Sequence, residues 1–406
     1  MRCIIAGLAA ACLTYAQQPS VLPQIQARMI ENLSRLPNYT CAQTTVRSVR
    51  RGSNRPFELM DTLRLEVALV EGKELFGWPG SNRITESDLT KLIGTGGALG
   101  NGNFGLLAKG VFLSRSTAFT FKGETVRDGH RALQFDYKVP QPASGYHLKV
   151  DRNDAVVGYH GSFWANAETL DLTRLEIYAD NIPADLGLAA VSDAMDYARV
   201  TIGESDFLLP KSAELNMASA SGLADHNRTR FHECHQYAGE SVLSFIEAPE
   251  SVPDAVVAPP AEIALPDDFQ VGVRLETPVT TESAIGDVVQ VKLLDTIKDH
   301  HERVVAKGAI LSGHIALLHR DGSWYHVGIS FTDMNGEEGH ADVSRRFNAL
   351  FAGAGARDLH LGATQLGFHG KKVLGAGEFA INGDRPLNLR TGYRITLRSR
   401  LLQSGR

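Results

Sequence analysis

The sequence has little cysteine, no long apolar run after its N-terminus and no strong excess of either charge. Of its 4 cysteines, only Cys41 and Cys234 lie beyond residue 16. No later segment offers the roughly 20 apolar residues that a membrane-spanning helix needs, so we expect no transmembrane span in the mature chain. The formal net charge of −5 is modest and gives no electrostatic reason to expect a nucleic-acid partner.

Motifs of nucleophilic and metal catalysis are also missing. The chain has no G-x-S-x-G and no H-E-x-x-H, and we predict no catalytic residue, cofactor or metal site. Gly100–Gly105 matches G-x-G-x-x-G, but that pattern holds a dinucleotide only between a strand and a helix, and here we expect a loop. In His232–His235 (His-Glu-Cys-His), alternate strand residues would point to opposite faces, so we favour a structural cysteine over a metal site.

Residues 1–16 are typical of a cleavable export signal. A positive start, Met1–Arg2, precedes the uncharged apolar stretch Cys3–Tyr15, and small residues then lead to Gln17. The sequence therefore predicts an exported, periplasmic protein. A buried N-terminal helix is the alternative. Cys12, which follows three alanines, leaves open lipidation and an association with the outer membrane.

The two cysteines of the mature chain predict one disulfide bond. Exported proteins keep their thiols in an oxidising compartment, where a pair of cysteines usually joins. Both Cys41 and Cys234 fall in predicted strands. Two free buried thiols remain the alternative.

Hydrophobic periodicity divides the chain into two mainly β parts. Val21–Leu36 has apolar residues at helical spacing, whereas Leu63–Leu69 alternates as a half-buried strand does. Dense strand signals with short turns follow, which favours an antiparallel sheet. Five prolines in 248–266 indicate a linker. We therefore predict a signal peptide at 1–16, a half-barrel domain with a few helices at 17–247, the linker at 248–266, and a smaller β-barrel or sandwich domain at 267–406.

Four aromatic residues lie on adjacent predicted strands: Tyr159, Phe163, Trp164 and Tyr178. Packing in a core explains them with the fewest assumptions. A groove for an apolar ligand explains them too, and we keep these four residues as its candidate lining.

The N-terminal part, residues 23–247, resembles the periplasmic lipoprotein-carrier superfamily, including its regulator relatives that sense envelope stress. The resemblance is carried by Gly145–Asp151, Gly161–Leu170, Leu172–Glu176 and Phe207–Lys211. It implies an open antiparallel half-barrel whose concave apolar face can hold acyl chains, and hence a lipid or lipoprotein as partner.

The C-terminal part is similar to the β-barrel domain of conjugal-transfer and type IV secretion outer-ring proteins. Leu275–Val289 is similar to the family pattern T-x-x-x-A-x-x-G-D-x-V, with one residue instead of two between Ala284 and Gly286. Val304–Ile315 is similar to a strand followed by a K-G turn, with Ala306 in place of a proline. Gly286 and Gly308 suit the turns between strands. The resemblance implies a small barrel that could dock an envelope protein.

The sequence thus favours a non-enzymatic binding or scaffold protein of the periplasm or cell envelope, with an apolar ligand as one option for the first domain. Two alternatives stay open. One is a subunit of an envelope-spanning secretion assembly, and the other is a hydrolase with a dispersed acid/base site that acts on cell-envelope polymer.

We predict that mature protein recovered from a bacterial host begins at or near Gln17, because the signal is removed during export. N-terminal sequencing or an intact-mass measurement checks this. Soluble cytoplasmic protein that still carries Met1 would contradict the export prediction.

Overall fold

The computed structural model describes a chain that is mainly β, as the sequence predicted. The described residues are 21–80, 84, 89–93, 98–100, 104, 106–150, 153–237, 270–299, 302–321, 324–336, 339–342, 350–352, 377–382 and 386–398. The expected signal peptide and linker lie outside these residues, as does most of the expected loop Gly100–Gly105.

An antiparallel sheet of 11 strands forms the larger part of the molecule, in the order β3-β2-β1-β11-β10-β9-β8-β7-β5-β4, with β6 paired to β7. Its strands are β1 (Tyr39–Arg51), β2 (Glu58–Val70), β3 (Lys73–Gly77), β4 (Ala118–Arg127), β5 (His130–Val139), β6 (Tyr146–Val150), β7 (Asn153–Asn166), β8 (Leu172–Asp180), β9 (Leu188–Ile202), β10 (Ser205–Ser219) and β11 (Leu223–Gln236). Tight turns join many neighbours. Between β4 and β5, Asp128 (φ 50°) and Gly129 (φ 81°) both take the left-handed conformation that a two-residue hairpin requires.

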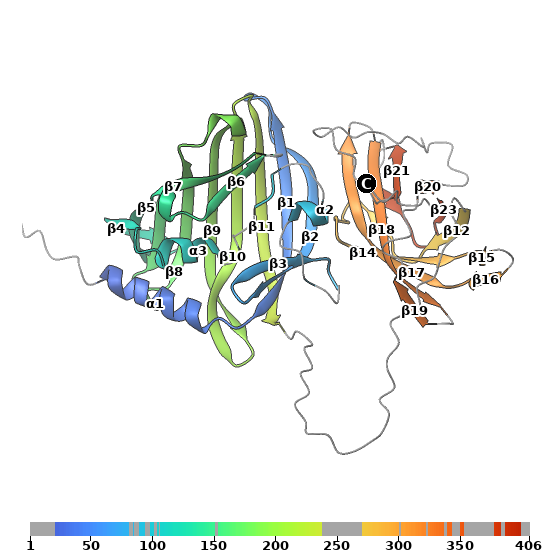
Figure 1. Ribbon diagram of the computed structural model, residues 1–406, viewed down its shortest axis with the longest axis horizontal. Helices are drawn as coiled ribbons and strands as arrows, with labels where there is room; N and C mark the ends of the chain where they lie inside the picture. The colour runs from blue at the N-terminus through green and yellow to red at the C-terminus, as the bar shows by residue number, and fades with distance from the viewer. Residues whose placement is uncertain are drawn as a thin grey trace, which may run out of the picture.

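A second sheet follows, in the order β19-β18-β17-β14-β12-β23-β20, with β21 paired to β18. Because β20 also contacts β21, this sheet curls back on itself. The strands of this part are β12 (Gln270–Leu275), β13 (Val279–Thr280), β14 (Val288–Leu293), β15 (Ile297–Asp299), β16 (Glu302–Val305), β17 (Ile310–Asp321), β18 (Trp324–Gly336), β19 (Gly339–Asp342), β20 (Leu350–Ala352), β21 (Gly377–Asn382), β22 (Asn388–Leu389) and β23 (Arg394–Arg398). Figure 1 draws the two sheets side by side, with β2 on the side of the larger one that is nearer to the smaller.

Among the described residues, three α-helices and two short 3₁₀ turns accompany the large sheet: α1 (Val21–Arg35), α2 (Leu89–Ile93), α3 (Leu106–Phe112), η1 (Gln141–Ala143) and η2 (Ala184–Leu186). Helix α1 ends before Pro37, which cannot continue a helix. Its side chains tie it to the sheet. The amide of Asn32 both donates to the carbonyl of Leu208 (3.0 Å) and accepts from its N–H (2.8 Å).

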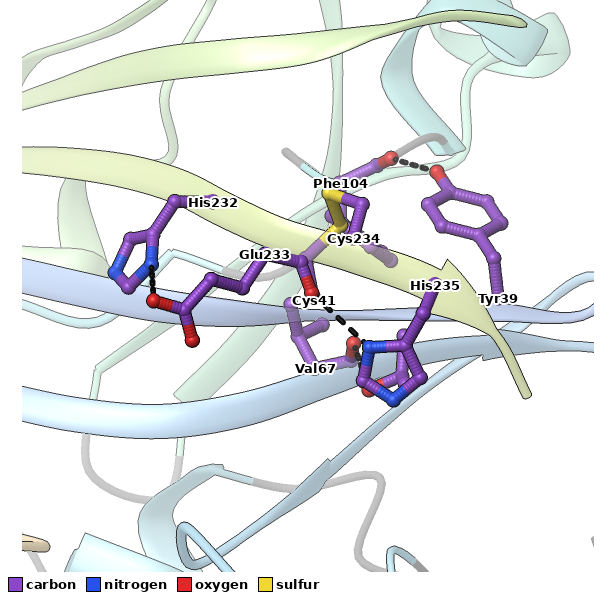
Figure 2. The surroundings of a disulfide bond; sticks show 9 residues. Tyr39, Cys41, Val67, Phe104, His232, Glu233, Cys234 and His235 are labelled. Atoms are coloured by element: carbon purple, nitrogen blue, oxygen red, sulfur yellow. Dashed lines mark hydrogen bonds and ion pairs between the residues drawn. A yellow bond between two sulfur atoms is a disulfide. The ribbon is translucent and has the colours of Figure 1, made fainter. Parts of the chain in front are cut away.

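The disulfide bond between Cys41 and Cys234 joins the first long strand of this sheet to the last (Figure 2). At this point two residues of β11, Glu233 and Cys234, lie opposite the single residue Cys41, because the register slips between Thr40 and Ala42. Glu233 has a φ of 52°, which marks a β-bulge. The cysteine of the His-Glu-Cys-His run is therefore a structural cysteine.

We predict that Cys41→Ser lowers Tm under oxidising conditions only. The bridge spans 193 residues, so its removal costs up to roughly 5 kcal/mol in the chain-entropy account. Thermal melts of the variant and of the natural chain, each with and without reductant, check this prediction. In the presence of reductant the two proteins should have the same Tm. Two free thiols in unfolded, unreduced protein would show that the bridge is absent.

Candidate functional site: the sheet interior and the seam

The inner face of the large sheet is a continuous apolar core. Period-two alternation turns every second residue of each strand inward, and these residues meet Ile25 and Met29 of α1 together with Val111 and Phe112 of α3 in one buried cluster. Helix α3 buries Leu107, Ala108, Val111 and Phe112 against this face of the sheet.

The four predicted groove residues do not share one face. Tyr159 and Phe163 point inward and are 2% and 0% exposed, whereas Tyr178 is 43% exposed. Trp164, next to Phe163 along β7, points outward as alternation requires and lies under the guanidinium of Arg127, 5.4 Å from its ring. These four residues therefore do not line one surface, and an apolar-ligand site in the first domain stays a prediction.

Aromatic packing fills the interior around the two inward rings. Phe163 stacks on Phe135 with ring centroids 5.0 Å apart and meets Phe112 of α3 edge-on at 5.1 Å. Tyr159 packs against Tyr146 at 5.7 Å. Its hydroxyl lies 2.8 Å from where a Cβ at Gly110 would stand, so that position of α3 has no room for a larger residue.

A small cavity of about 20 Å³ remains beneath the sheet, lined by polar residues of β1 and β11 and by apolar residues such as Leu63 and Leu65 of β2. Thr45 hydrogen-bonds to Thr229 (2.9 Å) and accepts from Gln43 (3.2 Å). Asn227 donates to the carbonyl of Ala98 at 2.7 Å, while its Oδ1 is buried without a partner among the described residues. The space suits a single bridging water and is far smaller than the about 300–1,000 Å³ of typical ligand pockets.

Buried phenols lie beside buried carboxylates elsewhere in the interior. Burial raises the pKa of Tyr146 well above its ordinary value, and Asp193, which accepts the phenol's hydrogen bond, raises it further. Burial and then Glu74 raise the pKa of Tyr39 in the same way, and Tyr39 donates to the carbonyl of Phe104 at 3.1 Å. Phenols with raised pKa values stay protonated at neutral pH, so they act as hydrogen-bond donors and not as bases.

Across the described ranges, no group of three or more His, Cys, Asp or Glu side chains is placed to hold a metal ion. Within the same part of the chain, no helix combines the length and apolar character needed to cross a membrane.

The second site is a seam between the two sheets, and sequence reasoning did not find it. We use "seam" for the contacts of Met60–Arg64 and Trp78 with Glu282–Asp287, His314 and His319. Leu63 and Ile285 form a parallel β-bridge. Its backbone hydrogen bonds run from Arg64 N to the Ile285 carbonyl (2.7 Å) and from Ile285 N to the Thr62 carbonyl (2.9 Å).

Two side-chain pairs, one ionic and one aromatic, reinforce the β-bridge between Leu63 and Ile285. Nη1 of Arg64 lies 2.6 Å from both carboxylate oxygens of Asp287. The ring of Trp78 stacks on His314, with centroids 4.1 Å apart and an interplanar angle of 25°. The only sequence signal for this contact is the Gly286-Asp287 turn, whose pattern suggests a turn and says nothing about a partner.

Comparisons with known proteins place the chain in no established family. No family model and no curated protein matches it. Among solved structures, it is similar to a putative outer membrane lipoprotein-sorting protein domain from Vibrio parahaemolyticus (11% identity, 52% of this chain and 92% of that chain, TM-score 0.25). It is also similar to a DUF1329 family protein from Desulfovibrio piger (10% identity, 54% and 92%, TM-score 0.28) and to ComB10 of the Com Type IV secretion system of Helicobacter pylori (12% identity, 32% and 85%, TM-score 0.20). These similarities are distant, and no functional argument rests on them.

We predict that Phe163→Ala and Trp164→Ala, two neighbours on opposite faces of β7, differ sharply in their effect on stability. Removing the buried Phe163 ring leaves a cavity and should cost about 3–5 kcal/mol of unfolding free energy. The outward Trp164 contributes mainly its contact with Arg127, worth about 1 kcal/mol. Urea unfolding of the two variants measures both costs. Equal losses would contradict the assignment of their faces.

Proposed function

We propose that the protein is an exported, non-enzymatic scaffold of the cell envelope, built from two β domains, 17–247 and 267–406, that work as a docked pair. The observation that carries the proposal is the combination of a filled interior and a specific seam. The filled interior leaves little room for a ligand. The seam fixes the position of the second sheet against strand β2 of the first.

The Cys41–Cys234 disulfide supports export, because such bonds persist in oxidising compartments such as the periplasm and are rare in the cytosol. It agrees with the export signal expected at residues 1–16. The modest net charge of −5 favours protein partners over nucleic acid, and the smaller domain is the one we assign to docking an envelope protein.

An apolar ligand, lipid or lipoprotein, is the competing function for the first domain. For an acyl chain to enter, α3 would have to withdraw Val111 and Phe112, which are 0% and 3% exposed. Burying such side chains stabilises the fold by roughly 1.5–3 kcal/mol each, so a ligand would have to compensate for their loss. This cost favours the scaffold over the carrier.

A thermal-shift panel separates the two functions. We expect fatty acids, phospholipids and an apolar dye to leave Tm of the full mature chain unchanged. A ligand at 100 times its Kd would instead add about 2.7 kcal/mol to the folded state, which raises Tm by roughly 5–11 °C for a domain of this size.

Phe112→Ala is the matched control for the panel, since it removes one ring of α3 from the interior and should allow the small dye to bind. A lipid that raises Tm of the natural chain would overturn the scaffold proposal in favour of a carrier. A silent panel for the natural chain, with a dye response in the variant, supports the scaffold.

A further inference from the structure

We propose that the seam is an acid-sensitive latch, which holds the two sheets together at neutral pH without help from the linker and loosens in acid. The latch rests on the proposed scaffold function and deepens it, because it gives the docked pair a means of regulation. Three features of the seam carry the proposal. They are the edge of β2 that β3 does not pair with, the turn at Gly286, which has no space for a side chain, and His314, which is buried against Trp78 of the other sheet.

The open edge belongs to the first half of β2. Strand β3 pairs only with residues Glu66–Val70 of β2, so the backbone of Thr62 and Arg64 keeps unpaired groups on that side. An unpaired strand edge is a template for a further chain segment. Ile285 supplies that segment, and its amide and carbonyl satisfy both groups.

Gly286 makes the close approach possible. Its φ is 99°, and a Cβ there would stand 1.9 Å from the carbonyl oxygen of Arg64. The turn is also fastened to its own sheet, since Gly286 N donates to the Ile315 carbonyl (2.7 Å) and Asp287 accepts from the amide of Ala284 (2.8 Å). The seam is therefore a close-fitting contact, with no space for a side chain at Gly286.

His314 lies on β17 and is 7% exposed beneath Trp78. Burial lowers its pKa from 6.5 to about 4. By register, Val288 of β14 and Ser330 of β18 lie opposite it, and neither titrates.

Four charged or titratable groups stand on the segments around His314. Arg64 and Asp287 are paired with each other. Glu66 accepts the amide of Gly80 at 3.0 Å. Nδ1 of His319, the other histidine of the seam, lies 3.3 Å from the carbonyl of Met60.

The direction of the pH effect follows from the lowered pKa. A neutral His314 fits the docked state, and a proton on it favours separation, where the imidazole regains its ordinary pKa. Docking is therefore fully present above pH 6.5 and weakens as pH falls from 6.5 toward 4. These two values predict that the dissociation constant of the seam rises roughly 30-fold between pH 8 and pH 5.

The test uses the full mature chain with a protease site placed at residues 253–260. Both disulfide cysteines lie in the first fragment, so no covalent bond joins the fragments after cleavage. Sedimentation over a dilution series gives their dissociation constant at each pH. We expect one complex at pH 8 and a dissociation constant roughly 30-fold higher at pH 5.

Matched variants separate the parts of the proposal. Gly286→Ala should separate the fragments at pH 8, whereas Gly308→Ala, with a similar φ of 94° but no contact with the first sheet within 4 Å of its added Cβ, should not. His314→Phe keeps an aromatic ring under Trp78 and should remove the acid effect, while His319→Phe should retain it.

Two results would overturn the latch. Fragments of the natural chain that separate at pH 8 as readily as those of Gly286→Ala would show that the linker alone joins the sheets. An unchanged acid response in His314→Phe would show that His314 does not control the seam. The first result would also remove the docked pair from the scaffold proposal, whereas the second would overturn the latch alone. A lipid that raises Tm of the natural chain would overturn the scaffold and leave the seam in place, so the two failures are distinguishable.

Discussion

Pairing between the first and last long strands of the large sheet is the constraint on which the rest of the structure depends. Strands β1 and β11 lie about 190 residues apart in sequence, yet they run antiparallel over almost their whole length. Bringing distant strands together costs loop-closure entropy, and the disulfide at their bulged end removes much of that cost from the unfolded chain. With this pair in place, β2 and β3 extend the sheet beyond β1, and β10, β9, β8, β7, β5 and β4 extend it beyond β11.

The interior of the sheet follows from this arrangement. Inward side chains of β1, β2 and β11 meet those of β5 and β7, and α1 and α3 complete the enclosure. Protein interiors pack as densely as organic crystals, and here the ring of Phe163 lies against those of Phe112 and Phe135. The polar residues Gln43, Thr45 and Thr229 bond to one another, as buried polar groups must.

The seam has a different physical character from either sheet. It combines two backbone hydrogen bonds, one partly exposed ion pair and one stacked ring pair. Exposed ion pairs contribute little by themselves, so the fit around Gly286 and the burial of His314 matter more. A contact made of so few interactions can be specific and still reversible. The proposed latch requires a reversible contact.

The sequence by itself determined the mainly β fold, the helix at Val21–Arg35 and the cysteine pair, because alternation, helical spacing and cysteine number are local signals. Its simpler interpretation placed Tyr159, Phe163, Trp164 and Tyr178 together in a core, and the structure buries only the first two of these four. Alternation alone puts Phe163 and Trp164 on opposite faces of β7, but only the tertiary structure decided that the face of Phe163 is the inner one and that Tyr178 faces outward. It alone decided that α3 fills the interior and that His314 meets Trp78, because contacts between distant segments depend on shape and burial and leave no periodic trace in the chain.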